Sequence, residues 1–206
     1  PPVTVLVGAD RHATVDLALR YLGLGAPTPV AADDQGRVRA DALAEALARA
    51  SGPTIVALQA GNLHSGSFDP FAEVVPLAHE HGAWVHVDGA FGLWAAASPR
   101  TSHLVRGIES ADSWACDGHK WLNVPYDSGF AFVRDASLMP GPFAFGAAYL
   151  PSDGVMFGVL GPEASRRARG LAVWATLRAY GRRGHREMVE RHLDLAQRVA
   201  RAVRAS

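Results

Sequence analysis

The sequence predicts an α/β protein with a mainly parallel sheet and flanking helices. Through the first two-thirds of the chain, short apolar runs alternate with segments whose apolar residues recur at helical spacing. This alternation is typical of a sheet built from strand and helix units. A loop of small and polar residues at 59–67 directly follows one apolar run. Because open α/β sheets bind ligands beyond the carboxyl ends of their strands, we expect a ligand site at that edge.

Glycine, proline and serine residues separate the individual elements. Gly23 and Gly25 end the first helical pattern, and a Ser-Gly-Pro sequence at 51–53 ends the second. Residues 139–161 are rich in glycine and proline without a clear period, so we expect an irregular segment there. The expected strands are 3–7, 54–58, 83–88, 112–116 and 129–133, and the expected helices are 11–22, 38–50 and 70–81.

The last part of the chain has a different character. Residues 163–180 and 186–203 carry two long helical patterns, with Gly181 and Gly184 between them. The second pattern has one apolar stripe and arginines on its other faces. The stripe consists of Met188, His192, Leu195, Val199 and Val203. We therefore expect one domain over residues 1–162, followed by helices at 163–206 that lead into another domain.

The composition is that of an ordinary globular protein. The 20 basic and 20 acidic side chains give a formal net charge of zero, and 49% of residues are hydrophobic. Disordered chains have high net charge and nucleic-acid binders have a basic excess, so we expect neither class. No apolar run approaches the roughly eighteen residues of a membrane span, so we expect no membrane partner. The one cysteine, Cys116, excludes an internal disulfide and favours a reducing, cytoplasmic location.

Lys120 is the only lysine among the 20 basic residues, the others being arginines. Arginine cannot perform amine chemistry, so a single retained lysine is a candidate for a Schiff base. It follows an expected strand and a glycine, and it stands next to His119. A lone lysine is more often a solvated surface residue, but the neighbouring Trp121 and Leu122 argue against simple exposure here.

Asp88 ends an expected strand in which alternate residues point to the same face. Trp84, His86 and Asp88 therefore share one face of the sheet. A carboxylate at the end of a buried strand needs a cation or a strong hydrogen-bond donor. Two other interpretations stay open: Asp88 caps the following Gly89-Ala90 turn, or it binds a metal with His86. The metal interpretation lacks a third ligand at a convincing spacing, so we expect no metal site.

These segments resemble those of the pyridoxal-phosphate-dependent amino-acid decarboxylases of the aromatic amino acid and glutamate decarboxylase type, which have the aspartate-aminotransferase-like fold. The segment His86-Val-Asp88-Gly-Ala90-Phe-Gly is similar to the family's His-Val-Asp-Ala-Ala-Tyr-Gly. Asp112-Ser and His119-Lys120-Trp121 resemble its lysine motif. Three further segments also resemble the family, and all of the segments stand in the expected order along the chain: 9–12, 66–70 and 165–181.

The resemblance implies a large domain of that fold over 1–162, incomplete at its N-terminus because the family's phosphate-binding segment precedes this region. It also implies that Lys120 forms a Schiff base with pyridoxal 5'-phosphate and that Asp88 pairs with its pyridine nitrogen. A carboxylate there keeps the nitrogen protonated. His12 would stack on the cofactor ring, and Ala90 would pack against the other face.

Three further residues are implied at the cofactor. His119 would lie near the phosphate or the substrate, and Asp117 would bind the cofactor. Asn62 stands where the family usually has a threonine near the phenolic oxygen, and it can still donate a hydrogen bond. The family's mobile loop often carries a proton-donating tyrosine, but residues 151–161 contain none; Tyr149 precedes them and Phe157 lies within.

The implied function is decarboxylation of an L-amino acid to an amine and CO2 by a longer, homodimeric protein. One alternative is an aminotransferase or an aldehyde-forming relative without the protonating tyrosine. Another is a non-catalytic fragment or structural subunit. The small-molecule substrate would be an amino acid, and an aromatic one only by analogy.

Overall fold

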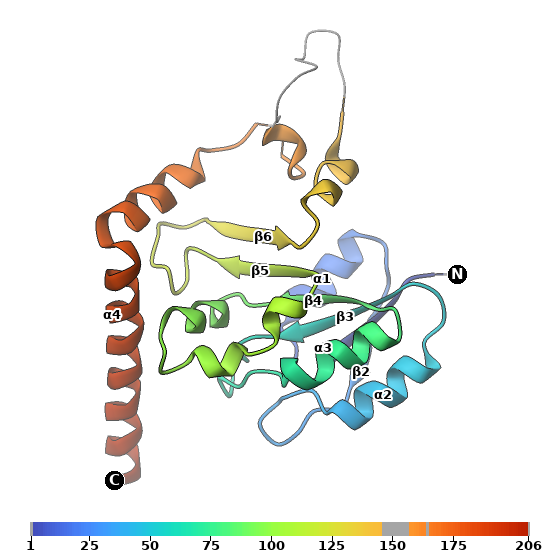
Figure 1. Cartoon of the computed structure of the whole chain (residues 1–206), viewed down its shortest axis with the longest axis horizontal. Helices are drawn as coiled ribbons and strands as arrows, with labels where there is room; N and C mark the ends of the chain where they lie inside the picture. Colours follow the sequence, from blue (N-terminus) through green and yellow to red (C-terminus); the bar gives the residue numbers. More distant parts are fainter. Residues whose placement is uncertain (1, 146–156, 164, 206) are drawn as a thin grey trace.

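The computed structural model describes residues 2–145, 157–163 and 165–205 of the chain. A single six-stranded sheet, in the order β2-β1-β3-β4-β5-β6, forms its centre (Figure 1). All neighbouring strands are parallel except β6, which runs antiparallel to β5. The α/β fold class predicted from the sequence is thus confirmed. The strands are β1 Thr4–Gly8, β2 Thr28–Val30, β3 Thr54–Gln59, β4 Trp84–Asp88, β5 Ser113–Asp117 and β6 Gly129–Val133.

Helices cover the sheet from both sides. Helices α2 (Ala40–Arg49) and α3 (Phe71–Glu80) lie on one side, and α1 (Ala13–Tyr21) lies on the other (Figure 1). His12 is the N-cap residue of helix α1, and its imidazole accepts the Thr14 N–H. Three short 3-10 helices, η1 (Gly92–Ala97), η2 (Ser102–Val105) and η3 (Ile108–Ser110), connect β4 to β5. Three more follow β6: η4 Ala136–Leu138, η5 Gly141–Phe143 and η6 Phe157–Val159.

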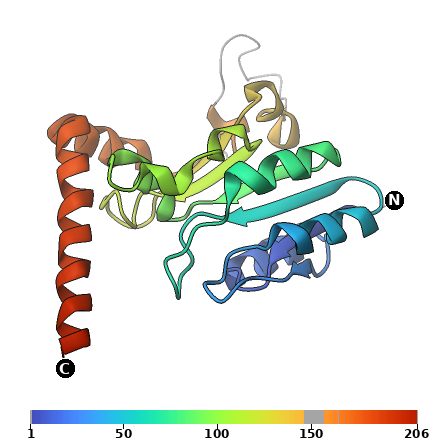
Figure 2. The same ribbon diagram turned by 60° about the horizontal axis from the view of Figure 1, so that its bottom comes forward.

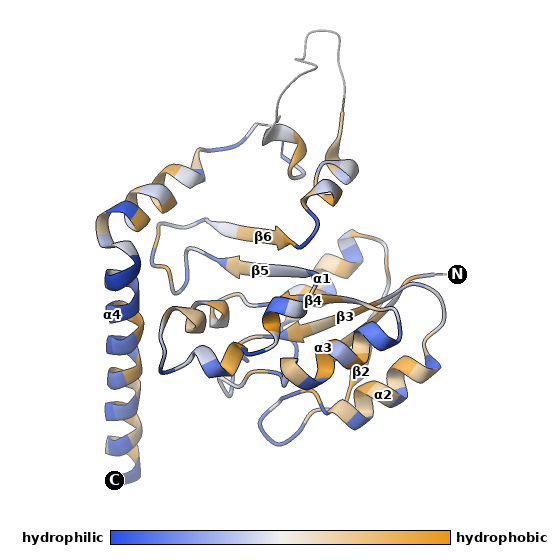
Figure 3. Ribbon diagram, in the orientation of Figure 1, coloured by the Kyte–Doolittle hydropathy of each residue, from blue (hydrophilic) through white to orange (hydrophobic). Residues whose placement is uncertain are grey.

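The main core lies between the sheet and helices α2 and α3. Alternate strand residues point into it, so that one sheet face is almost fully buried, and β3, α2 and α3 are largely coloured as hydrophobic in Figure 3. Burying each such side chain stabilises the fold by about 1.5–3 kcal/mol, which holds the strands as a rigid base for the residues on the opposite face. The strand residues of this core are Leu6, Val30, Val56, Leu58, Val85 and Val87.

Strand β2 and two boundaries differ from the sequence predictions. Strand β2 was not expected, because it has only three residues and includes Pro29; proline is tolerated there since β2 is an edge strand. Strand β5 ends at Asp117, one residue later than expected, so this carboxylate lies at the carboxyl end of the strand. The helix expected from residue 163 begins only at Arg169.

Helix α4 (Arg169–Ala205) is two helices joined at Gly181, where φ is 60°. The break predicted at Gly181 is confirmed, whereas Gly184 lies inside the second helix. Val189 is buried, and Ser98, next to η1, donates to Glu190 at 2.8 Å. Beyond this contact the last turns project away from the sheet (Figure 2), and the end of the predicted apolar stripe is exposed. The division into two domains near residue 162 stays a prediction.

No helix among the described residues, α4 included, has the length and apolar composition required to cross a membrane.

Asp69 is a buried carboxylate that joins two loops near the end of β3. It accepts the backbone N–H of Val38 at 2.8 Å with one oxygen and that of Gln59 at 2.6 Å with the other. Burial raises the pKa of Asp69 to about 6, so the carboxylate is largely ionised at pH 7.5 and accepts both bonds.

We expect Asp69→Asn to destabilise the protein by about 1–3 kcal/mol. The amide has one acceptor oxygen, so its NH2 group faces a backbone N–H that is left without an acceptor. Chemical denaturation of the complete protein at pH 7.5 measures the change, with the exposed Asp34→Asn as the matched control. Equal stability of the two variants would show that Asp69 does not accept both bonds.

Candidate active site

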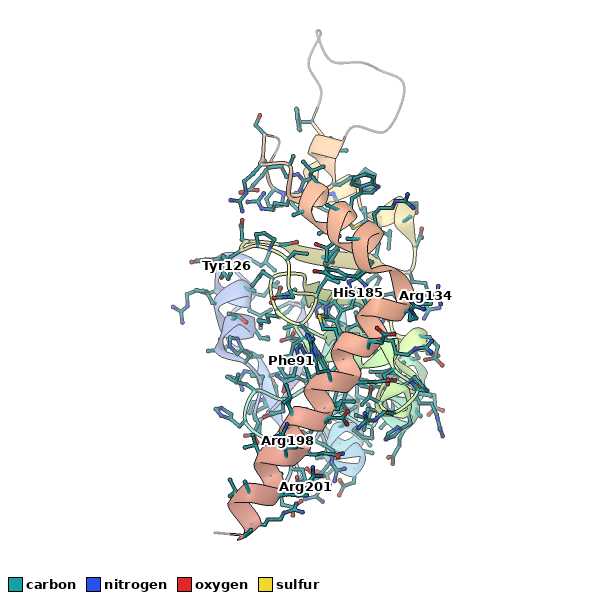
Figure 4. The ribbon with its side chains drawn as sticks, turned by 90° about the vertical axis from the view of Figure 1, so that its left-hand side faces the viewer. Phe91, Tyr126, Arg134, His185, Arg198 and Arg201 are labelled. Atoms are coloured by element: carbon teal, nitrogen blue, oxygen red, sulfur yellow. The ribbon has the colours of Figure 1, made fainter. Side chains whose placement is uncertain are left out.

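A cavity of about 1090 Å³ lies over the sheet face opposite α2 and α3. It reaches the carboxyl ends of β3, β4 and β5, where the sequence predicts a ligand site. Two of its aromatic residues, both labelled in Figure 4, differ in burial: Tyr126 is exposed and Phe91 is partly buried. All predicted site residues except Asn62 line this cavity: His12, Asp88, Ala90, Asp117, His119 and Lys120.

Asp88 is the last residue of β4, on the partly buried face that it shares with Trp84 and His86, as predicted. One of its carboxylate oxygens accepts the Ala90 N–H at 3.1 Å. The capping interpretation of Asp88 is therefore confirmed. No lysine or arginine among the described residues lies within ion-pair distance of Asp88, so it can still bind a cationic ligand in the cavity.

Lys120 lies in the loop between β5 and β6. Its Nζ donates to the Asp117 carboxylate at 2.9 Å, and Asp117 ends β5. The Lys120 side chain is 42% exposed, so the expectation that its apolar neighbours keep it from solvent is wrong for this chain. The reason is that Leu122 turns into the core, whereas Lys120 points to the open cavity. The amine is thus oriented by Asp117 and accessible to a ligand.

His119 is held beside the lysine by both its backbone and its ring. Its Nδ1 lies 2.6 Å from the Ser128 carbonyl oxygen and 3.1 Å from the Ser128 nitrogen. The imidazole also lies against the Tyr126 ring, with 4.1 Å between the centroids. A side chain on Gly118 would come within 2.8 Å of the Ser128 hydroxyl, so a larger residue would have to displace side chains where the two ends of this loop meet.

The segment before and within α4 anchors the same loop at two points. Arg167 and Arg169 both pair with the Asp127 carboxylate, and the hydrogen bond from Arg169 lowers the pKa of Asp127. Farther along α4, His192 accepts the Trp121 indole N–H at 3.0 Å. The loop that carries Lys120 is therefore fastened to α4 on both sides of Gly181.

Asn62, the remaining predicted site residue, does not line this cavity. Its side chain is 3% exposed, and its amide donates to the Asp10 carbonyl at 3.1 Å and the Gln59 side chain at 3.2 Å. Its oxygen accepts the His64 and Ser65 N–H groups. With these bonds made inside its own loop, Asn62 organises the loop, and a direct contact with a ligand in the cavity is not supported.

Several cavity residues were not anticipated. Ser113 stands in the Asp112-Ser segment of the lysine motif and Tyr126 in the loop after it, but neither residue was given a role of its own. Tyr126 stands only six positions after Lys120 in the same loop, which could have indicated that it lies near the lysine. The pairing of Ser113 with His86 could be found only through the strand register.

The described residues contain no group of three or more His, Cys, Asp or Glu side chains positioned to bind a metal ion. Tyr149 and most of the segment 151–161, on which the question of a tyrosine proton donor depends, lie outside the described residues.

Comparisons with known proteins agree on one family. A sequence model described as the pyridoxal-dependent decarboxylase conserved domain matches residues 3–206. An aromatic-L-amino-acid decarboxylase of Drosophila lebanonensis is 34% identical over 96% of this chain. The chain covers 52% of that relative, so it spans about half its length.

Solved structures give the same result for the fold. The crystal structure of mouse CSAD superposes with a TM-score of 0.92 at 26% identity, covering 100% of this chain and 45% of that one. The structure of Oryza sativa TDC with PLP and tryptamine superposes with a TM-score of 0.83 at 27% identity, covering 90% of this chain and 41% of that one.

Proposed function

The chain belongs to the pyridoxal-dependent decarboxylase family, and we propose that the complete protein converts an L-amino acid to its amine and CO2. One observation carries this proposal: the only lysine of the chain lines the same cavity as Asp88 and His12, although the three come from distant segments. The local contacts of these side chains do not require that they share a cavity, and Asp88 has no cationic partner among the described residues.

The chemistry of these side chains fits pyridoxal 5'-phosphate. Its aldehyde requires a primary amine, which Lys120 provides, and its pyridine nitrogen requires a carboxylate, which Asp88 provides. The imidazole of His12 and the small Ala90 can lie against a flat ring. When bound, this cofactor supplies an electron sink for the bond that breaks at the substrate's α-carbon.

Each residue has a task that follows from its contacts. Asp117 orients the Lys120 amine through the 2.9 Å ion pair. The negative charge of Asp88 favours a proton on the ring nitrogen, which strengthens the electron sink. His12 is fixed as the N-cap of α1, and His119 is fixed through Ser128. In the overall reaction the bond to the α-carboxylate breaks, CO2 leaves, and a proton takes its place on the α-carbon.

We propose an aromatic amino acid as the substrate. Leu63, Phe91 and Tyr126 give the cavity apolar walls, which favour a flat apolar side chain over a charged one. The similarity to the aromatic-L-amino-acid decarboxylase of Drosophila lebanonensis supports the same class of substrate. A homodimer is proposed as well, because Leu171, Trp174 and Leu177 of α4 are exposed apolar side chains that a partner could cover. The free thiol of Cys116 supports a cytoplasmic location.

Product analysis of the complete protein tests the proposed reaction. With an aromatic L-amino acid we expect equal amounts of amine and CO2, and with L-glutamate we expect little turnover. The corresponding amine, which has no carboxylate, is the blank. Aldehyde and ammonia as products would favour an aldehyde-forming enzyme, and an oxo acid formed with an amino acceptor would favour an aminotransferase. Either result would contradict the proposal.

A further inference from the structure

Two side chains on the cavity face of the sheet share one hydroxyl group. The Trp84 indole N–H donates to Ser113 Oγ at 2.9 Å, and His86 Nδ1 lies 2.8 Å from the same oxygen. The parallel pairing of β4 and β5 makes His86 and Ser113 register partners, so the contact is built into the sheet. None of these three residues has a role in the function proposed above.

We infer that Trp84 and Ser113 fix the tautomer of His86 so that its Nε2 carries the proton, which makes His86 a positioning residue for Asp88. The Nε2–H then forms a fixed dipole on the strand face that also carries Asp88. The consequence for Asp88 rests on the proposed function, in which that charge pairs with the ring nitrogen. The tautomer of His86 does not depend on the proposed function.

The direction of each hydrogen bond follows from the groups involved. An indole can only donate, so Ser113 Oγ accepts from Trp84. The hydroxyl proton then needs an acceptor, and His86 Nδ1 is the acceptor that the described residues provide. The opposite arrangement, with a proton on Nδ1, would leave the Ser113 hydroxyl proton without an acceptor among the described residues. A partly buried hydroxyl proton without a partner is unfavourable.

Burial keeps His86 in its neutral form. It lowers the pKa of the imidazole, and the nearby negative charge of Asp88 only partly opposes this effect. A neutral imidazole has a single N–H group, so a bond accepted at Nδ1 places that proton on Nε2.

The positions of His86 and Asp88 direct this donor to the site. They are two residues apart on the same face of β4, about 6.6 Å along the strand, and both line the cavity. The carboxylate already accepts one N–H, from Ala90 at 3.1 Å. The fixed N–H dipole of His86 on the same strand face adds to the polar environment of this carboxylate.

A nuclear magnetic resonance experiment on the complete protein without cofactor tests the tautomer. The protein is labelled with ¹⁵N-histidine, and His86 is identified by the signal that disappears in His86→Gln. We expect the Nε2-protonated tautomer in the unmodified protein and a mixture of tautomers in Ser113→Ala. A predominantly Nδ1-protonated His86 in the unmodified protein would overturn the inference, and the only variant that this reading needs is His86→Gln, which assigns the signal.

Cofactor binding tests the consequence for Asp88. We expect Ser113→Ala to raise the dissociation constant of pyridoxal phosphate about tenfold and to shift its visible absorbance. Ser113→Thr, which keeps the hydroxyl, should restore both. Ser110→Ala removes an exposed serine hydroxyl elsewhere and is the matched control. A folded Ser113→Ala protein with unchanged affinity and absorbance would overturn the role of His86. Absence of cofactor binding in the unmodified protein would instead contradict the proposed function and leave the tautomer result standing.

Discussion

Lys120→Ala is expected to abolish covalent attachment of pyridoxal phosphate and to lower turnover by roughly 10⁴-fold or more. No other lysine of the chain can replace the amine, because Lys120 is the only one. The test has two parts. Borohydride reduction of the loaded complete protein should place a phosphopyridoxyl group on the peptide that contains Trp121, and this adduct should be missing from the variant.

Lys120→Arg is the matched control for this experiment. An arginine keeps a positive charge opposite Asp117, so the ion pair seen at 2.9 Å is preserved, but a guanidinium does not form the bond to the cofactor. The arginine variant should therefore fold like the unmodified protein and still lose turnover. Unchanged visible absorbance and cofactor stoichiometry in Lys120→Ala would refute the assignment.

Asp88→Asn is expected to lower turnover by about a hundredfold or more, comparable to the loss of a preorganised electrostatic contact. The asparagine oxygen can still accept the Ala90 N–H, so the turn after β4 keeps its shape while the charge is lost. Steady-state kinetics and the cofactor absorbance measure the effect. Glu73→Gln, a carboxylate-to-amide change at an exposed position on α3, controls for a general loss of charge.

Turnover of Asp88→Asn near that of the unmodified protein would show that Asp88 does not control the ring nitrogen. The two variants also separate two roles. Lys120→Ala removes the covalent link, whereas Asp88→Asn keeps the link and weakens the electron sink, so only the first should prevent the borohydride adduct.

The sequence predicts best what depends on local periodicity. The shared face of Trp84, His86 and Asp88 follows from the two-residue repeat of a strand, and the structure confirms it. The break at Gly181 is likewise a local property, since glycine readily adopts positive φ. These features need no knowledge of distant parts of the chain.

What the sequence could not predict depends on contacts between distant segments. The exposure of Lys120 depends on which elements surround the loop, and its apolar neighbours did not determine it. Asn62 was expected at the ligand because of its place in the chain, but its bonds to Asp10 and Gln59 turn it into the loop. The link between Ser113 and His86 depends on strand register, which a single sequence does not specify.

The attachment of the lysine loop to α4 has a mechanical consequence. Asp127 is tied to Arg169 before Gly181, and Trp121 is tied to His192 after it. The loop therefore contacts both halves of α4, one on each side of Gly181. A change in the angle at Gly181 would therefore be opposed by whichever of these two contacts it lengthens, so both halves of α4 help to hold the loop that carries Lys120.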